Sequence, residues 1–176
     1  MIISEFHLTL MRNYNQMKSI FIISGPVHSG KTTRLISWLN NKNNLYGILS
    51  PVIDDKRYLL DINSYEKRIL EVSGKRDHEG VITVGKYKFA KSVFEWGCEV
   101  IINSIEENPE WIVIDEVGPL ELQGEGLAKA VNRVFSHQNI LGRTNLVIIV
   151  RDYLMTDFLN HYSLTEKDII YFNDSS

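Results

Sequence analysis

The chain has 176 residues, of which 44% are apolar and 23% are charged, and its formal net charge is −3. This charge gives no general attraction to nucleic acid or to an anionic membrane, and no apolar run reaches the roughly 20 residues that a membrane helix needs. A single cysteine, Cys98, excludes an internal disulfide, so we expect a cytoplasmic protein. The length fits one core, and we expect a single domain over residues 20–176 after an N-terminal extension of unassigned role at residues 1–19.

A glycine-rich motif follows the first apolar run. Residues 20–23 predict a buried strand, and residues 25–32 read G-x-x-x-x-G-K-T, before apolar residues at helical spacing in 35–39. Glycine permits the backbone to approach a polyphosphate closely, so this pattern predicts a phosphate-binding loop. The alternative is a glycine-containing turn beside a solvated lysine, and the strand–loop–helix context favours the loop.

The loop predicts a nucleotide site with a magnesium ion. Lys31 would contact the β- and γ-phosphates, and Thr32 would offer its hydroxyl to Mg²⁺. The residues expected to bind nucleotide are Gly25, Pro26, Val27, His28, Ser29, Gly30, Lys31, Thr32 and Thr33.

A β-rich insertion comes next. Residues 46–50 predict a short strand that ends at Pro51, and the runs 57–62 and 68–72 predict a hairpin around Asn63-Ser64. A polar loop at 73–80 and a further strand at 81–84 follow. Apolar residues at helical spacing predict an amphipathic helix over 92–107, which Asn108-Pro109 ends.

Two adjacent carboxylates end the next strand, which is predicted at residues 111–116. Open parallel sheets bind ligands at the carboxyl ends of their strands, so Asp115 is expected to share the Mg²⁺ ion with Thr32. Glu116 is expected to point elsewhere and to orient a water molecule or accept its proton. The alternative for the pair is a solvated turn at a strand end.

The remaining segments predict a helix near 127–135, a buried strand at 146–150, a short helix at 153–160 and a strand at 168–172. The alternation predicts a three-layer α/β fold, with a mainly parallel sheet flanked by helices and a β-hairpin insertion. A second cation for the γ-phosphate is expected from Arg151, with Arg143 and Arg34 as other candidates. A plain surface arginine is the competing interpretation for each.

These residues resemble the small P-loop nucleoside-triphosphatases first recognised in thermophiles, also called the cancer-related nucleoside-triphosphatase family. The resemblance spans residues 20–172 and includes G-x-x-x-x-G-K-T-T at 25–33 and the family's D-E-[IV]-G-x-[ML]-E-L signature at 115–122. Pro119, where many members carry lysine, departs from the pattern, and the match is weak from Arg143 onward. The resemblance implies a RecA-like core, Mg²⁺-dependent hydrolysis of several nucleoside triphosphates, and Glu121 as a second catalytic acid. A carboxylate that accepts backbone N–H groups at a helix start would explain Glu121 equally well.

We therefore expect a nucleoside-triphosphate phosphohydrolase that forms diphosphate and phosphate. Broad base tolerance is expected because the chain lacks a base-specific motif such as N-K-x-D. One alternative is a small-molecule or nucleotide kinase, which needs an acceptor pocket and usually an arginine-bearing lid. Another is a nucleotide-dependent switch or adaptor that docks through the hairpin at 57–72. A nucleoside triphosphate is the expected partner, no membrane or nucleic-acid partner is expected, and the oligomeric state is left open.

Overall fold

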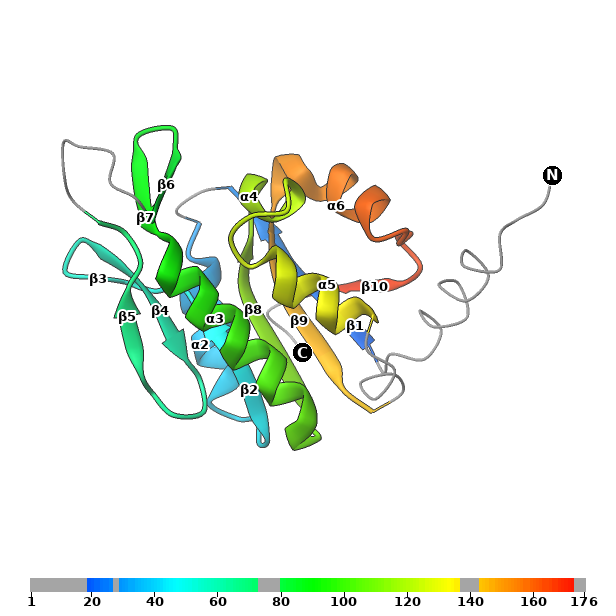
Figure 1. Ribbon diagram of the computed structural model, residues 1–176. Coiled ribbons are helices and arrows are strands. Elements are labelled where there is room, and N and C mark those ends of the chain that lie inside the picture. The colour runs from blue at the N-terminus through cyan, green and yellow to red at the C-terminus, as the bar shows by residue number, and fades with distance from the viewer. Residues whose placement is uncertain (1–18, 27–28, 73–79, 137–142, 173–176) are drawn as a thin grey trace.

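The computed structural model describes residues 19–26, 29–72, 80–136 and 143–172 (Figure 1). The predicted extension at 1–19 falls outside these ranges except for Ser19, so the domain division stays a prediction. The strands and helices, in chain order, are β1 (Ser19–Gly25), α2 (Lys31–Leu39), β2 (Leu45–Leu49), β3 (Val52–Ile53), β4 (Lys56–Asp61), β5 (Lys67–Ile69), β6 (Val81–Val84), β7 (Tyr87–Ala90), α3 (Lys91–Ser104), β8 (Trp111–Val117), α4 (Pro119–Leu122), α5 (Ala128–Ser136), β9 (Asn145–Arg151), α6 (Met155–His161) and β10 (Ile169–Tyr171).

An eight-stranded sheet forms the centre of the molecule. Its strand order is β10-β1-β9-β8-β2-β4-β3, with β5 paired to β4. The five strands from β10 to β2 run parallel, and the insertion strands β3, β4 and β5 add antiparallel pairs. Strand β9, late in the sequence, therefore lies between β1 and β8, which carry the phosphate loop and the adjacent acids.

Alternate residues of the central strands face opposite sides of the sheet, because successive side chains of a strand point in opposite directions. Ile112 and Ile114 belong to the core under α3, α5 and α6, whereas Val113 belongs to the core under α2, where Leu35 is fully buried. Helices thus cover both faces of a mainly parallel sheet. The predicted three-layer α/β fold is confirmed.

Gly47 lets β2 lie close against β8. Its φ angle is +113°, a region that side chains rarely adopt, and a Cβ atom there would overlap the carbonyl oxygen of Val113. Only glycine fits both conditions. This contact holds the carboxyl end of β2 beside the carboxyl end of β8.

The predicted hairpin at 57–72 is confirmed as β4 and β5, although β5 ends at Ile69. Three elements were not predicted: β3, β7 and α4. Strand β7 pairs antiparallel with β6 in a separate two-stranded sheet, across a turn at Gly85 with φ +58°. The helix predicted over 92–107 divides into α3 and a 3-10 turn at Ile105–Glu107.

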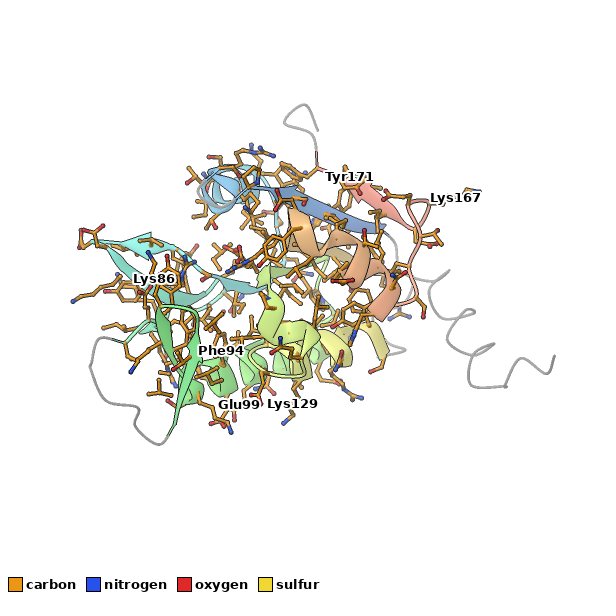
Figure 2. All side chains as sticks on the ribbon, turned by 90° about the horizontal axis from the view of Figure 1, so that it is seen from above. Lys86, Phe94, Glu99, Lys129, Lys167 and Tyr171 are labelled. Carbon is orange, nitrogen blue, oxygen red and sulfur yellow. The ribbon has the colours of Figure 1, made fainter. Side chains whose placement is uncertain are left out.

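The insertion and the carboxyl-terminal strand occupy opposite ends of the molecule. Seen from above, Lys86 of the β6–β7 hairpin lies at one end and Tyr171 of β10 at the other, with Phe94 of α3 near the first (Figure 2). Cys98 of α3 is a buried free thiol. Within the described ranges, no helix has the length and apolar character needed to span a membrane.

Candidate nucleotide-binding site

The carboxyl ends of β1, β9, β8 and β2 meet at one edge of the sheet. In the parallel register, Gly25 of β1 lies opposite Arg151 of β9, and Val150 of β9 lies opposite Val117 of β8. The pairing is irregular between Ile114 and Val117, where the two acids stand. The edge therefore gathers the start of the loop, an arginine and two carboxylates.

Lys31 is the first residue of α2 and is folded back over the loop. Its ammonium donates hydrogen bonds to the carbonyl oxygens of Gly25 at 2.8 Å and Pro26 at 2.7 Å, and the residue is only 7% exposed. Gly30 precedes it in the left-handed conformation at φ +78°. The alternative interpretation, a turn beside a solvated lysine, does not fit this buried and hydrogen-bonded side chain.

Other predicted loop residues face solvent. Exposed positions are Pro26, Ser29, Gly30 and Thr33. The backbone N–H of Ser29 donates to Pro26 O at 3.3 Å, which closes the loop ahead of the helix. The predicted positions Val27 and His28 fall outside the part of the chain that the structure describes.

Asp115 at the end of β8 is joined to the loop helix. Its carboxylate accepts a hydrogen bond from the backbone N–H of Ser50 at 3.0 Å, and the Thr32 side chain lies near enough to stabilise its charged form. Burial raises the pKa of Asp115 to about 6, since the charged form loses its hydration, and Ser50 and Thr32 offset part of that effect. At 2% exposure, Asp115 is not part of a solvated turn.

Glu116 faces a different partner. Its Oε1 accepts a hydrogen bond from Arg151 Nε at 2.6 Å, and the two side chains are 23% and 31% exposed. Arg143, another candidate cation, is exposed and precedes the amino end of β9, whereas the acids lie at the carboxyl ends of the strands. The third candidate, Arg34, lies on α2. The structure thus brings Arg151, and not Arg143, to the acids.

Glu121 lies in the short helix α4 and is 4% exposed. Its Oε2 accepts the backbone N–H of Gly118 at 2.8 Å and its Oε1 accepts that of Leu127 at 3.0 Å. Burial raises the pKa of this carboxyl, and the backbone hydrogen bonds oppose the rise. Glu121 thus accepts backbone N–H groups at the start of a helix, as the alternative interpretation expected. A catalytic role for Glu121 stays a prediction.

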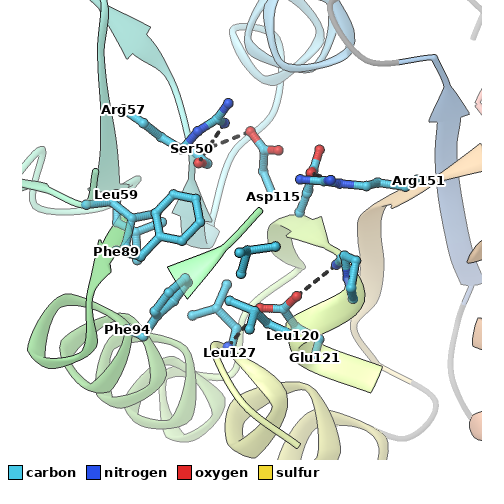
Figure 3. A pocket seen from close by; sticks show the side chains of 15 residues that line it. Ser50, Arg57, Leu59, Phe89, Phe94, Asp115, Leu120, Glu121, Leu127 and Arg151 are labelled. Carbon is cyan, nitrogen blue, oxygen red and sulfur yellow. Dashed lines mark hydrogen bonds and ion pairs between the residues drawn. The ribbon is translucent and has the colours of Figure 1, made fainter. Parts of the chain in front are cut away.

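A pocket opens beside the acids, and two of the polar residues that line it, Ser50 and Arg57, were not among the predicted site residues (Figure 3). We call it the acid-side pocket, because Asp115, Glu116 and Arg151 line it together with Ser50 and Arg57. The Ser50-Pro51 strand end was a usable signal for Ser50, because parallel strands end at the same edge. Arg57 has no comparable signal, since only the antiparallel pairing of β4 brings it there.

A glycine loop between a buried strand and a helix, with a buried carboxylate from a nearby strand beside the loop threonine, defines a P-loop nucleotide-binding protein. A family model described as NTPase matches residues 20–168. The chain belongs to this NTPase family, and it is an enzyme of the nucleoside-triphosphatase class.

Two relatives agree with this assignment. Nucleoside-triphosphatase THEP1 of Archaeoglobus fulgidus is 28% identical over 136 residues, which cover 73% of this chain and 74% of the relative. The crystal structure of THEP1 from the hyperthermophile Aquifex aeolicus superposes with a TM-score of 0.67 at 17% identity and 88% coverage of both chains. The second likeness supports the fold alone. The expected family membership is confirmed.

Proposed function

We propose that the protein is a Mg²⁺-dependent nucleoside-triphosphate phosphohydrolase with broad base tolerance, which converts the triphosphate to diphosphate and phosphate. The observation that carries the proposal is the buried carboxylate of Asp115 beside Thr32, the residue that follows the loop lysine. This arrangement joins the phosphate loop to the acids of β8.

The loop and Lys31 would hold the polyphosphate. Backbone N–H groups at the start of α2 point out of the helix end, which attracts anions. Lys31 would exchange the carbonyl oxygens of Gly25 and Pro26 for β- and γ-phosphate oxygens, which are stronger acceptors for an ammonium group.

The residues present fit a magnesium ion. Thr32 and Asp115 would hold it, because hydroxyl and carboxylate oxygens are the ligands that Mg²⁺ prefers, and a buried carboxylate gains most from a nearby cation. When bound, the ion neutralises charge on the phosphates. The positive charge of the ion would also favour the ionised form of Asp115 over the protonated form.

Arg151 and Glu116 would have separate roles in the transfer step. Arg151 would donate to the γ-phosphate oxygens, which accumulate charge during transfer, and this movement would free Glu116 to orient the attacking water or take its proton. Their ion pair holds both side chains beside the loop until then. Base tolerance is proposed from the missing N-K-x-D motif, and a cytoplasmic location from the lone free thiol Cys98.

Phosphate release from ATP, GTP, CTP and UTP with and without Mg²⁺ tests the proposal. Glu116→Gln should lower turnover by about 10²- to 10⁴-fold and leave nucleotide binding intact. Arg151→Ala should lower turnover by at least about tenfold. Arg143→Ala is the matched control, because this arginine lies at the opposite end of β9. Phosphate release no greater than that of Lys31→Ala, with every nucleotide, would refute the hydrolase assignment.

A further inference from the structure

The acid-side pocket extends away from the phosphate loop into the insertion. None of the described loop residues lines it, whereas Leu59 of β4, Phe89 of β7 and Phe94 of α3 form one wall. Figure 3 shows these three side chains on one side and Asp115 with Arg151 on the other. The pocket therefore has an apolar end beneath the hairpins and a polar end at the acids.

The apolar end suits a ring. Phe89 and Phe94 meet edge to face, with centroids 6.0 Å apart and an interplanar angle of 68°. Leu120 and Leu127 close the pocket from the side of α4. Pockets of this kind, apolar with a few converging polar groups, bind small molecules.

The polar end offers a cation. The carboxylate of Glu116 is paired with Arg151, and that of Glu121 with two backbone N–H groups. The carboxylate of Asp115 accepts from the backbone N–H of Ser50 and is also stabilised by the charge of Arg57. The Nη1 atom of Arg57 lies 3.5 Å from Ser50 Oγ, which is long for such a bond, so this guanidinium keeps donors for a ligand. An anionic group would find its strongest partner there.

We propose that the acid-side pocket binds a second small molecule, one with a ring-sized apolar body and one anionic group, beside the γ-phosphate. The position of the γ-phosphate rests on the proposed function. The bound molecule would occupy the space in front of Glu116, where the attacking water must enter, and would slow hydrolysis. Such a pocket is also what the kinase alternative requires, and its arginine comes from β4 rather than from a lid.

Fluorine NMR on the full chain without nucleotide tests the binding directly. We expect para-fluorobenzoate to bind with a Kd of about 1 mM, as is usual for a ligand of this size, and its neutral isostere para-fluorobenzamide to bind several-fold more weakly. Arg57→Gln should abolish the preference for the acid, because only the charge-assisted hydrogen bonds distinguish the two.

Val84→Trp is designed to fill the pocket. Val84 lines it from the end of β6, whereas Thr83 beside it is exposed, so Thr83→Trp is the matched control. The first variant should weaken binding by at least about tenfold, and the control should bind as the parent does. Without ligand, Thr83→Trp should hydrolyse nucleotide at the parental rate, whereas Val84→Trp, whose side chain takes the place of the ligand, should hydrolyse it more slowly. If a melting curve shows Val84→Trp unfolded, Leu120→Trp fills the same space from α4.

Absence of binding by both probes, or equal binding by the parent and a folded pocket-filling variant, would overturn the proposal. If para-fluorobenzoate binds but does not slow phosphate release by the parent protein, the position proposed for the ligand in front of Glu116 is wrong. The titration contains no nucleotide and the parental hydrolysis assay contains no probe. Failure of the pocket and failure of the proposed function therefore give different results.

Discussion

Asp115→Asn should stabilise the metal-free protein at neutral pH while it weakens magnesium binding. The pKa of Asp115 rises from 3.8 to about 6 on folding, chiefly because burial penalises its charge. Asparagine resembles the protonated acid and can still accept from Ser50 and meet the Thr32 hydroxyl. The substitution therefore removes the cost of an ionised, buried carboxylate.

The magnitude follows from the shift. A rise from 3.8 to about 6 corresponds to about 3 kcal/mol of unfolding free energy at pH values above both. For a chain of this length, that equals roughly 6 to 12 °C in Tm. Because the folded pKa is the higher one, the stability tied to the proton is fully present below pH 3.8 and is lost as the pH rises through about 6.

Thermal melts in chelator near pH 8 and near pH 4 provide the assay. Asp115→Asn should melt higher than the parent near pH 8, and the difference should shrink near pH 4, where both side chains are neutral. Asp157→Asn, an exposed change on α6, should alter stability by less than about 0.5 kcal/mol. A lower Tm for Asp115→Asn near pH 8, or a difference independent of pH, would refute the reasoning.

Three further substitutions test the fold around the site. Gly47→Ala should destabilise the protein far more than Gly85→Ala, because only the first adds a clash with backbone to an unfavourable φ angle; similar Tm losses would contradict this. Glu121→Ala should lower the free energy of unfolding in urea by about 2 to 5 kcal/mol, since two buried N–H groups lose their acceptor. Glu121→Gln should cost less, and equal losses for the two variants would show that the lost acceptor is not the cause. Phe158→Ala should lower the free energy of unfolding by about 3 to 5 kcal/mol, because it leaves a cavity under α6. Tyr153→Ala, at an exposed side chain, is the control, and a larger loss for Tyr153→Ala than for Phe158→Ala would contradict the packing.

Local patterns were enough for most of the fold. The apolar runs at 111–114 and 146–150 are continuous because both faces of a central parallel strand are buried, so the sequence identified these strands directly. Strand β6 was predicted at 81–84, but its partner β7 was not, because β7 lies outside the main sheet and its exposed and half-buried residues give a weak period. The helix α4 has only four residues, too few for a periodic signal.

By itself the sequence determined the phosphate loop, the two strand-end acids and the layered α/β fold, because each depends on residue types within a few positions of one another. Only the tertiary structure decided how the acids are used. The hydrogen bond from Ser50 to Asp115 spans 65 residues and the ion pair of Arg151 with Glu116 spans 35. Such contacts depend on strand order and register, with β9 inserted beside β8 and the insertion folded over β2. A linear pattern does not encode which strands become neighbours, so the acid-side pocket and the place of Arg57 in it were shown only by the folded chain.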